Sequence, residues 1–147
     1  MGKREKRREK REKRKENKEK RIKRKEFMSF RKRHNYKNLK IWFLGLEIAN
    51  NISDILQDFP HHEKYDLSSQ LSKCSVSMPS NIAEGSARTD KAFSHFLDIS
   101  LGSSFELGTQ LLVAHYRKHI NKKTLEILED KNEEFQRMTM SFQNGLN

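Results

Sequence analysis

The first 33 residues limit what this chain can fold into, because almost every position between Lys3 and Glu26 is charged. These 33 residues contain 19 lysines and arginines and 6 glutamates, a net charge of +13. Ile22 is the only apolar residue between Lys3 and Glu26. A segment without an apolar face cannot join a hydrophobic core. Any compact fold must therefore be built from the 114 residues that follow.

The charged segment has two open interpretations. Its glutamates recur every three or four residues from Glu5 to Glu19, so a helix would align them on one stripe. Pairs such as Glu9 with Lys13 stabilise an isolated helix by about 0.2–0.5 kcal/mol each. A solvated single helix and a disordered segment both agree with this pattern.

The basicity of the chain is confined to this segment. The whole chain has 31 basic and 20 acidic residues and a net charge of +11, so the part from His34 onward has 12 basic and 14 acidic residues and a charge of −2. A part of that length suffices for one small domain. We predict a basic extension over residues 1–34 and one helical domain over residues 35–147.

Apolar residues recur at helical spacing in four parts of this domain. They predict helices over residues 39–59, 67–84, 89–116 and 122–142. Thr89 and Asn121 are suitable N-caps, and Gly85 is suited to a position just after a helix. With two prolines and no alternating strand pattern, the fold class is all-α. We expect an up-and-down antiparallel four-helix bundle, preceded by a charged helical or disordered N-terminal extension.

Two features of the predicted helices are unusual. Pro79 lies inside the second helix, where proline costs about 3 kcal/mol. We expect a kink, in which the hydroxyl of Ser75 or Ser77 occupies the backbone groups that the proline leaves without a hydrogen bond. The alternative is two short helices. In the third helix, the small residues at 102–104 predict the close approach of another helix.

Few residues suggest chemistry. Cys74 is the single cysteine, which excludes an intramolecular disulfide, and it falls on an apolar stripe where we expect core packing. His115 and His119 are four residues apart, and Glu63 follows two histidines. Because a functional metal site needs at least three converging ligands, no metal or cofactor is predicted. The sequence shows no nucleophile paired with a base, so it gives no indication of an enzyme.

The longest apolar run, residues 41–46, is far shorter than the roughly 20 residues of a membrane span. We expect a cytoplasmic protein without a membrane partner.

Four stretches of the sequence resemble one known family. They are "YKNLKIW" from Tyr36, "EKYDLSSQL" at 63–71, "SMPSNIAEGSAR" at 77–88 and "FLDISLGSSFELGTQLLVA" at 96–114. The family comprises the four-helix-bundle proteins encoded in intervening sequences of bacterial 23S ribosomal RNA genes. The resemblance implies an up-and-down bundle that assembles into a ring, typically a homopentamer, without enzymatic activity. A related accessory variability protein of diversity-generating retroelements binds a reverse transcriptase and its RNA.

The resemblance identifies Pro79, Asn81, Glu84 and Gly85 as a signature, which we interpret as structural. This chain departs from its relatives at Ser72-Lys73, where they often have a basic pair, and at Gly108, where they often have an acidic residue. The usual extent of the family also fits a start at Met28, so whether residues 1–27 are expressed stays open.

Basic residues near aromatic ones are typical of RNA-binding surfaces. Tyr36, Trp42 and Phe43 lie near several lysines and arginines, although we expect Trp42 to pack in the core or between protomers. The candidate RNA-binding residues are Arg31, Lys32, Arg33, Lys37, Lys40, Lys73, Arg88 and Lys91. The leading hypothesis is a non-enzymatic homo-oligomeric bundle that binds RNA, ribosomal RNA above all, by electrostatic attraction. The alternative is a protein-interaction adaptor, such as an accessory subunit that docks a reverse transcriptase.

Overall fold

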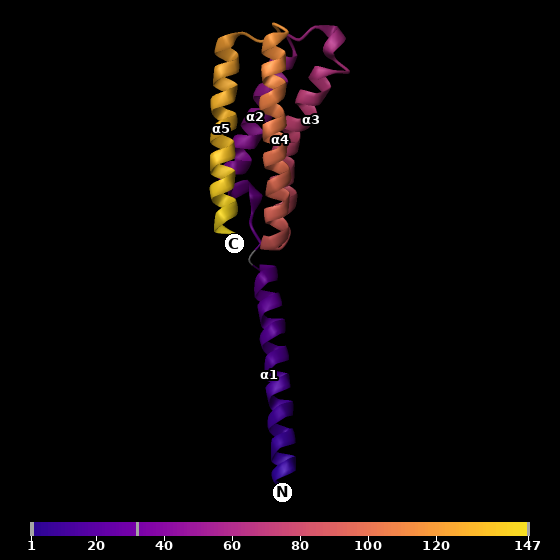
Figure 1. The fold of residues 1–147 in the computed structure, drawn as a ribbon, viewed down its shortest axis with the longest axis vertical. Coiled ribbons are helices and arrows are strands. Elements are labelled where there is room, and N and C mark those ends of the chain that lie inside the picture. The colour runs from indigo at the N-terminus through magenta and orange to yellow at the C-terminus, as the bar shows by residue number, and fades with distance from the viewer. Residues whose placement is uncertain (1, 32, 147) are drawn as a thin grey trace. The chain divides into compact units, whose positions relative to one another are not determined.

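A computed structural model describes residues 2–31 and 33–146, without the side chains of residues 28–31. The chain divides into two units, Met1–Arg33 and His34–Asn147. The described residues form helices and no strand, which confirms the all-α prediction. In the first unit, helix α1 spans Lys3–Arg31, and every side chain described in it is exposed (Figure 1). Of the two interpretations of the charged segment, the structure agrees with the solvated helix.

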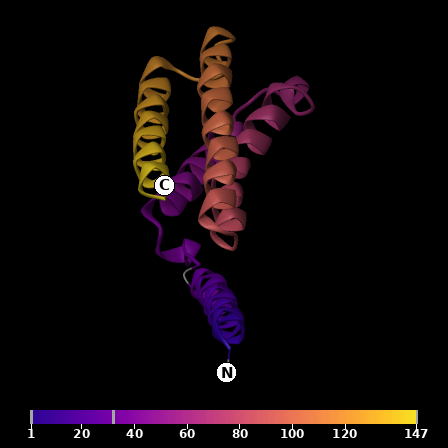
Figure 2. The ribbon, with the colours of Figure 1, turned by 60° about the horizontal axis from the view of Figure 1, so that its bottom comes forward.

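The second unit is a four-helix bundle. Its helices are α2 (Lys40–Leu56), α3 (Leu67–Ser86), α4 (Asp90–Tyr116) and α5 (Lys122–Gly145). Two short 3-10 helices, η1 (Tyr36–Asn38) and η2 (His61–Glu63), precede α2 and α3. Helices α2 and α4 each contact both α3 and α5, so the four helices enclose one core (Figures 1 and 2). The predicted bundle is confirmed.

Side chains from all four helices fill this core. Burying each large one stabilises the fold by about 1.5–3 kcal/mol relative to leaving it in water. Helix N-termini are capped as predicted, because Thr89 accepts a hydrogen bond from Ala92 N and Asn121 accepts one from Thr124 N. The largest fully buried side chains include Ile48, Ile52, Leu71, Met78, Ile82, Phe93, Leu97, Leu107, Leu111 and Phe135.

Three predicted helix ends differ from the structure, and one of them is the end of α5, which continues to Gly145 beyond the predicted residue 142. Helix α2 ends at Leu56, and Phe59 is buried from the turn that follows it. Helix α3 continues to Ser86, so Gly85 lies inside the helix and has no positive φ. Glycine is needed there for space instead, because a Cβ at Gly85 would lie 2.7 Å from Phe96 Cβ.

Pro79 lies within one continuous helix, which excludes the alternative of two short helices. The predicted role of the serine hydroxyls is wrong. Ser75 Oγ donates to Ser72 O at 3.1 Å, and Ser77 Oγ pairs with Ser103 Oγ at 2.8 Å, so neither occupies the carbonyl of Ser75 that the proline frees. The ring of Pro79 is buried beside Gly45 of α2, where a Cβ would lie 3.3 Å from Pro79 N.

Among the small residues of α4, the serines contact neighbouring helices. Gly102 is exposed, and a Cβ there would meet nothing within 4 Å, so the expected close approach does not occur at this residue. Ser103 and Ser104 are buried instead. Ser104 Oγ donates to Asn132 Oδ1 at 2.6 Å, and Asn132 Nδ2 donates to Ser104 O at 2.9 Å. This pair joins α4 to α5 and accounts for a polar residue in the apolar stripe of α5.

Candidate nucleic-acid interface

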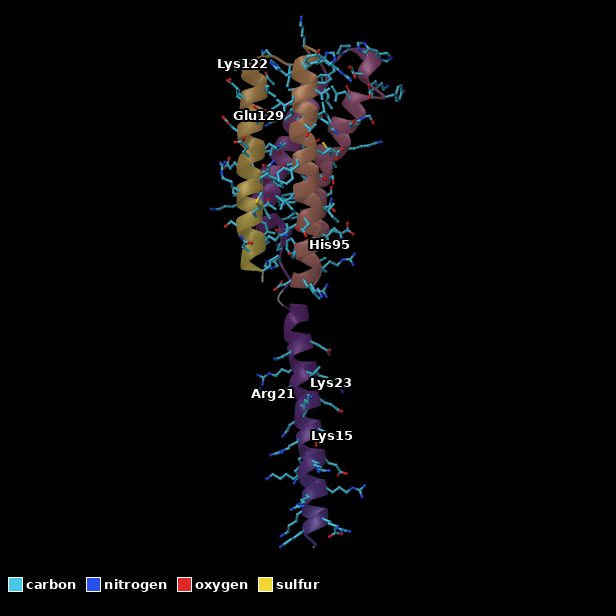
Figure 3. All side chains as sticks on the ribbon, viewed as in Figure 1. Lys15, Arg21, Lys23, His95, Lys122 and Glu129 are labelled. Atoms are coloured by element: carbon cyan, nitrogen blue, oxygen red, sulfur yellow. The ribbon has the colours of Figure 1, made fainter. Side chains whose placement is uncertain are left out.

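Helix α1 has a cationic surface over most of its circumference, and its glutamates from Glu5 to Glu19 lie along one stripe. It contains 17 basic and 6 acidic residues, a net charge of +11. At 1.5 Å per residue, its 29 residues extend over about 43 Å. Lys15, Arg21 and Lys23 project from the helix into solvent (Figure 3). Such a helix offers phosphate groups many contacts, and its exposed apolar side chains are few, among them Ile22 and Phe27.

The glutamates of α1 neutralise few of its cations. Lys13 Nζ lies 2.6 Å from Glu9 Oε1, Lys20 pairs with Glu16, and Arg8 Nε lies 3.2 Å from Glu12 Oε1. The hydrogen bond from Lys13 and its charge lower the pKa of Glu9. In the described part of the chain, most other cations of α1, such as Lys10 and Arg14, have no acidic partner within 4 Å.

Four of the predicted RNA-binding residues lie at one end of the bundle. Lys37 is in η1 and Lys40 begins α2, whereas Arg88 lies in the turn between α3 and α4 and Lys91 lies at the start of α4. The up-and-down topology places these segments together. His34, which precedes η1, confirms this, because its ring lies 5.3 Å from that of Phe93 and 5.5 Å from that of Phe142.

Acidic groups partly neutralise this basic end. Arg88 Nη2 lies 3.5 Å from Glu84 Oε1, and its guanidinium also lies over the Phe96 ring. Asp90 lies 3.6 Å from His34 Nε2. The lysines of this end, Lys37, Lys40 and Lys91, are exposed.

The other predicted RNA-binding residues do not join them. Lys73 is exposed on α3, 15 residues before Arg88, which places it about 22 Å away along the helix. Arg33 is exposed and belongs to the first unit. Lys32 and the side chain of Arg31 lie outside the described residues.

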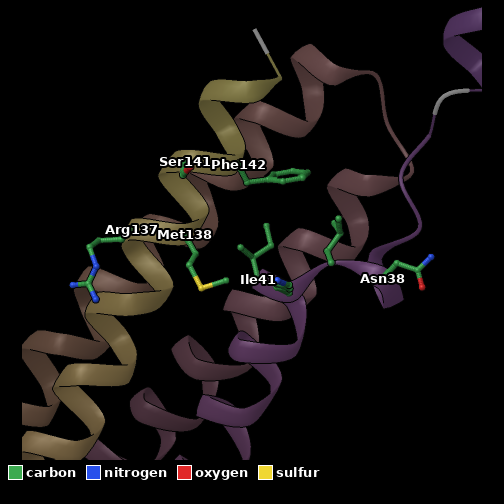
Figure 4. Close-up of a pocket in the computed structure, with 8 residues that line it drawn as sticks. Asn38, Ile41, Arg137, Met138, Ser141 and Phe142 are labelled. Carbon is green, nitrogen blue, oxygen red and sulfur yellow. The ribbon is translucent and has the colours of Figure 1, made fainter.

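Sequence reasoning missed Arg137, which together with Lys40 lines a groove between the start of α2 and the end of α5. The groove has a volume of about 500 Å³ (Figure 4). Its lining is mostly apolar and includes Ile41, Met138 and Phe142. The pairing of α2 with α5 brings these residues together, and no spacing in the sequence could indicate it.

The aromatic residues near the start of α2 form a cluster of their own. The Trp42 ring contacts those of Tyr36 and Phe43 edge to face, with centroids 5.2 and 5.1 Å apart. Trp42 is half-buried, and it lines a second groove of about 510 Å³ between α2 and α3. Phe43 is 55% exposed.

The opposite end of the bundle contains a buried carboxylate. Glu63 is 3% exposed, accepts two hydrogen bonds from Arg117 Nη1 at 3.0 and 3.1 Å, and accepts another from His119 Nε2 at 3.0 Å. Leu67 N donates a further bond at 3.3 Å. The bond from His119 lowers the pKa of Glu63 most; burial opposes it, and Arg117 and Leu67 N lower it further.

His115 and His119, four residues apart in the sequence, do not lie on one helix face. Helix α4 ends at Tyr116, and Lys118, with φ of 64°, turns the chain before His119. His115 Nδ1 contacts Ile120 O at 3.1 Å, whereas His119 joins Glu63. Sequence spacing could not reveal this contact between residues 56 positions apart.

Cys74 and the signature residues have structural surroundings. Cys74 is buried, and burial raises the pKa of its thiol to about 12, so it is not a ready thiolate nucleophile. Its Sγ lies 3.2 Å from Gln110 Oε1. Asn81 Nδ2 donates to Ser77 O at 2.8 Å within α3. The Cys74 thiol and the Asn81 amide therefore both contact groups within the bundle.

Comparison with known proteins agrees with the fold. A family described as "23S rRNA-intervening sequence protein" matches residues 37–141, more than half of the chain. The chain belongs to this family. Its resemblance to intervening-sequence proteins is thereby confirmed.

A solved structure has a similar fold. It is a protein of unknown function from the S23 ribosomal protein family of Bacteroides thetaiotaomicron, with a TM-score of 0.66 and 21% sequence identity. The match covers 71% of this chain and 95% of the other. No curated protein matches the chain. Among the described residues, no helix is both long and apolar enough to cross a membrane.

Proposed function

We propose that this intervening-sequence family member is a non-enzymatic RNA-binding protein whose helix α1 supplies most of the affinity. The observation that carries the proposal is α1 itself, a helix with a net charge of +11 and no buried side chain among those described. Lysines and arginines that contact phosphates release condensed counterions, which favours binding without regard to sequence. The bundle, at −2, adds little electrostatic attraction overall.

The basic end of the bundle provides a second, weaker contact. Lys37, Lys40, Arg88 and Lys91 lie at this end, and Arg137 lies beside the groove next to Lys40. The apolar floor of that groove is able to accept an unstacked base while the two cations hold its phosphates. The family's description supports ribosomal RNA as the RNA concerned.

Self-association would repeat these contacts. Phe105, Leu112 and Tyr116 are exposed by 54%, 53% and 87% on α4, and their spacing of seven and four residues places them on one face of the helix. An apolar stripe of this kind favours contact with another copy of the chain. Together with the resemblance, it supports a homo-oligomer, and a pentameric ring would multiply weak RNA contacts. Light scattering on the full chain measures the mass; a monomer at all concentrations contradicts this part of the proposal.

RNA binding is tested by fluorescence anisotropy with labelled ribosomal RNA fragments over a series of potassium chloride concentrations. We expect the logarithm of the affinity to fall linearly with the logarithm of salt concentration. Replacing Lys10, Arg14 and Arg21 with Gln removes three contacts, which lowers the slope by about 2 for a single-stranded RNA.

The matched control removes the same charge from the bundle, by replacing Lys64, Lys122 and Lys123 with Gln. These lysines are exposed and lie outside the basic end. We expect a smaller change in affinity and in slope. Equal effects of the two triple variants, or an affinity that does not respond to salt, would contradict the proposed role of α1.

The second candidate function is an adaptor that docks a partner protein, such as a reverse transcriptase. The groove between α2 and α3 favours it, because Trp42, Val76 and Pro79 line it and Val76 is 52% exposed. Val76→Arg would block such docking without a change in RNA affinity. Co-purification with a co-expressed reverse transcriptase, lost in this variant, would support the adaptor; its persistence in the variant would exclude docking at this groove.

A further inference from the structure

Three potential metal ligands converge at the end of the bundle opposite the basic end. His62 and Glu63 belong to η2, and His119 follows α4 in the connection to α5. One ligand atom from each residue lies within 4.8 Å of the other two. Residues from both connections therefore meet at one point, with the nitrogen and oxygen donors that zinc accepts.

The separations fit a single zinc ion. Zinc bonds of about 2.0–2.1 Å in tetrahedral geometry place ligand atoms about 3.3 Å apart. His119 Nε2 lies 3.0 Å from Glu63 Oε1, and His62 Nε2 lies 3.7 Å from the same oxygen. The ligand atoms of His62 and His119 lie within 4.8 Å of each other, so the exposed His62 side chain would move by up to about 1.5 Å to complete the site.

The surrounding structure holds two of the ligands in place. Glu63 is buried, and the side chain of His119 is 11% exposed, with its ring 5.1 Å from that of Phe59. Lys118, at a φ of 64°, makes the turn that directs the chain back toward Glu63. The side chain of His62 is 74% exposed, which leaves one side of the cluster open to solvent.

Arg117 is the competitor that a metal ion must displace. Its Nη1 lies 3.0 and 3.1 Å from the two oxygens of Glu63. It also lies 3.5 Å from Asp66 Oδ2, an exposed carboxylate that has room to receive it. The guanidinium can therefore exchange one carboxylate for the other instead of becoming an unpaired charge.

We propose that His62, Glu63 and His119 form a zinc-binding site, with water as the fourth ligand and Arg117 transferred to Asp66. To bind zinc through Nε2, His119 must carry its single ring proton on Nδ1, so protonation of the ligands in acid competes with the metal and weakens binding. The bound ion would link the α2–α3 connection to the α4–α5 connection. This site is separate from the proposed RNA-binding surfaces.

The test is a titration of the full, chelator-treated chain with zinc, and with cobalt as a spectroscopic substitute. We expect one equivalent to bind, the strong visible absorption of four-coordinate cobalt to appear, and magnesium to give no signal. Zinc should also raise the melting temperature, since a ligand that binds the folded state stabilises it. If the protein does not bind zinc even when zinc is in excess, the proposal is overturned.

Matched variants locate the site. His62→Ala removes an exposed ligand without disturbing the core, and it should weaken zinc binding more than about 100-fold, beyond the loss typical of an outer-shell partner. His61→Ala, its exposed neighbour outside the cluster, should leave the affinity unchanged. Arg117→Gln removes the competitor and should tighten binding. Equal effects of the two histidine variants, or weaker binding in Arg117→Gln, overturn the proposal.

Discussion

Gly85 and Gly102 have opposite surroundings in neighbouring helices. A Cβ at Gly85 would lie 2.7 Å from Phe96 Cβ and 2.9 Å from Phe93 Cδ1, whereas one at Gly102 would meet nothing within 4 Å. The sequence presents both as small residues near a helix contact. Only the packing of α3 against α4 shows that there is no space for a side chain at Gly85 and that there is space for one at Gly102.

Alanine at these two positions should therefore have opposite effects. Gly85→Ala should destabilise the bundle by about 1–3 kcal/mol, because the added methyl group overpacks the contact with two phenylalanines. Gly102→Ala should stabilise it by about 0.5–1 kcal/mol through helix propensity alone. Urea unfolding of both variants measures the difference; a stable Gly85→Ala protein would show that α4 shifts freely.

Thr139 has a fully buried side chain whose hydroxyl finds no hydrogen-bond partner among the described residues. A buried polar atom left unpaired costs about 1–3 kcal/mol. Thr139→Val keeps the shape and removes the hydroxyl, so we expect about 1 kcal/mol of added stability in chemical denaturation. Thr124→Val, at a half-buried position near the start of α5, serves as the control and should gain less. A less stable Thr139→Val protein would contradict the assignment.

The segment η2 is tied to the rest of the bundle by one carboxylate. Glu63 receives bonds from Arg117 and His119 of the α4–α5 connection, so two loops that are distant in sequence hold each other. Short 3-10 helices have poor internal hydrogen bonds, which makes such external contacts important to their position. The sequence shows Glu63 after two histidines and gives no sign of its partners.

This contact predicts a pH dependence in metal-free buffer. The pKa of Glu63 is lowered in the folded state, so its contribution is present above the ordinary value of 4.5 and is lost as the pH falls through the folded value. Glu63→Gln should lower the melting temperature at neutral pH, and the difference from the parent should shrink in acid. Glu84→Gln, at an exposed pair with Arg88, should change little. A constant difference across the acid range would contradict the prediction.

The two units of the molecule differ in what stabilises them. The hydrophobic core cluster is drawn entirely from residues 41–135 of the bundle. Helix α1 depends on its own hydrogen bonds and on pairs such as Glu9 with Lys13. Isolated helices without packing are marginal and lose structure gradually on heating.

Removal of residues 1–33 should leave the cooperative unfolding of the bundle at the same temperature. The lost circular dichroism signal should be that of α1, and in the full chain this part should decline gradually below the main transition. Thermal scans of the two proteins measure both effects. A large drop in the main transition after truncation would show that α1 contributes to the stability of the bundle.

The fold class, the four helices with two of their caps, the exclusion of the charged segment from the core, and the family could all be predicted from the sequence. Helical periodicity and charge are local patterns, so a linear sequence displays them directly. Which distant side chains meet became known only from the folded chain. There Lys40 and Arg137 line one groove, Asn132 bonds Ser104, and Glu63 bonds His119. These contacts depend on the three-dimensional packing of the helices and on the turns at their ends, which spacing along one chain does not encode.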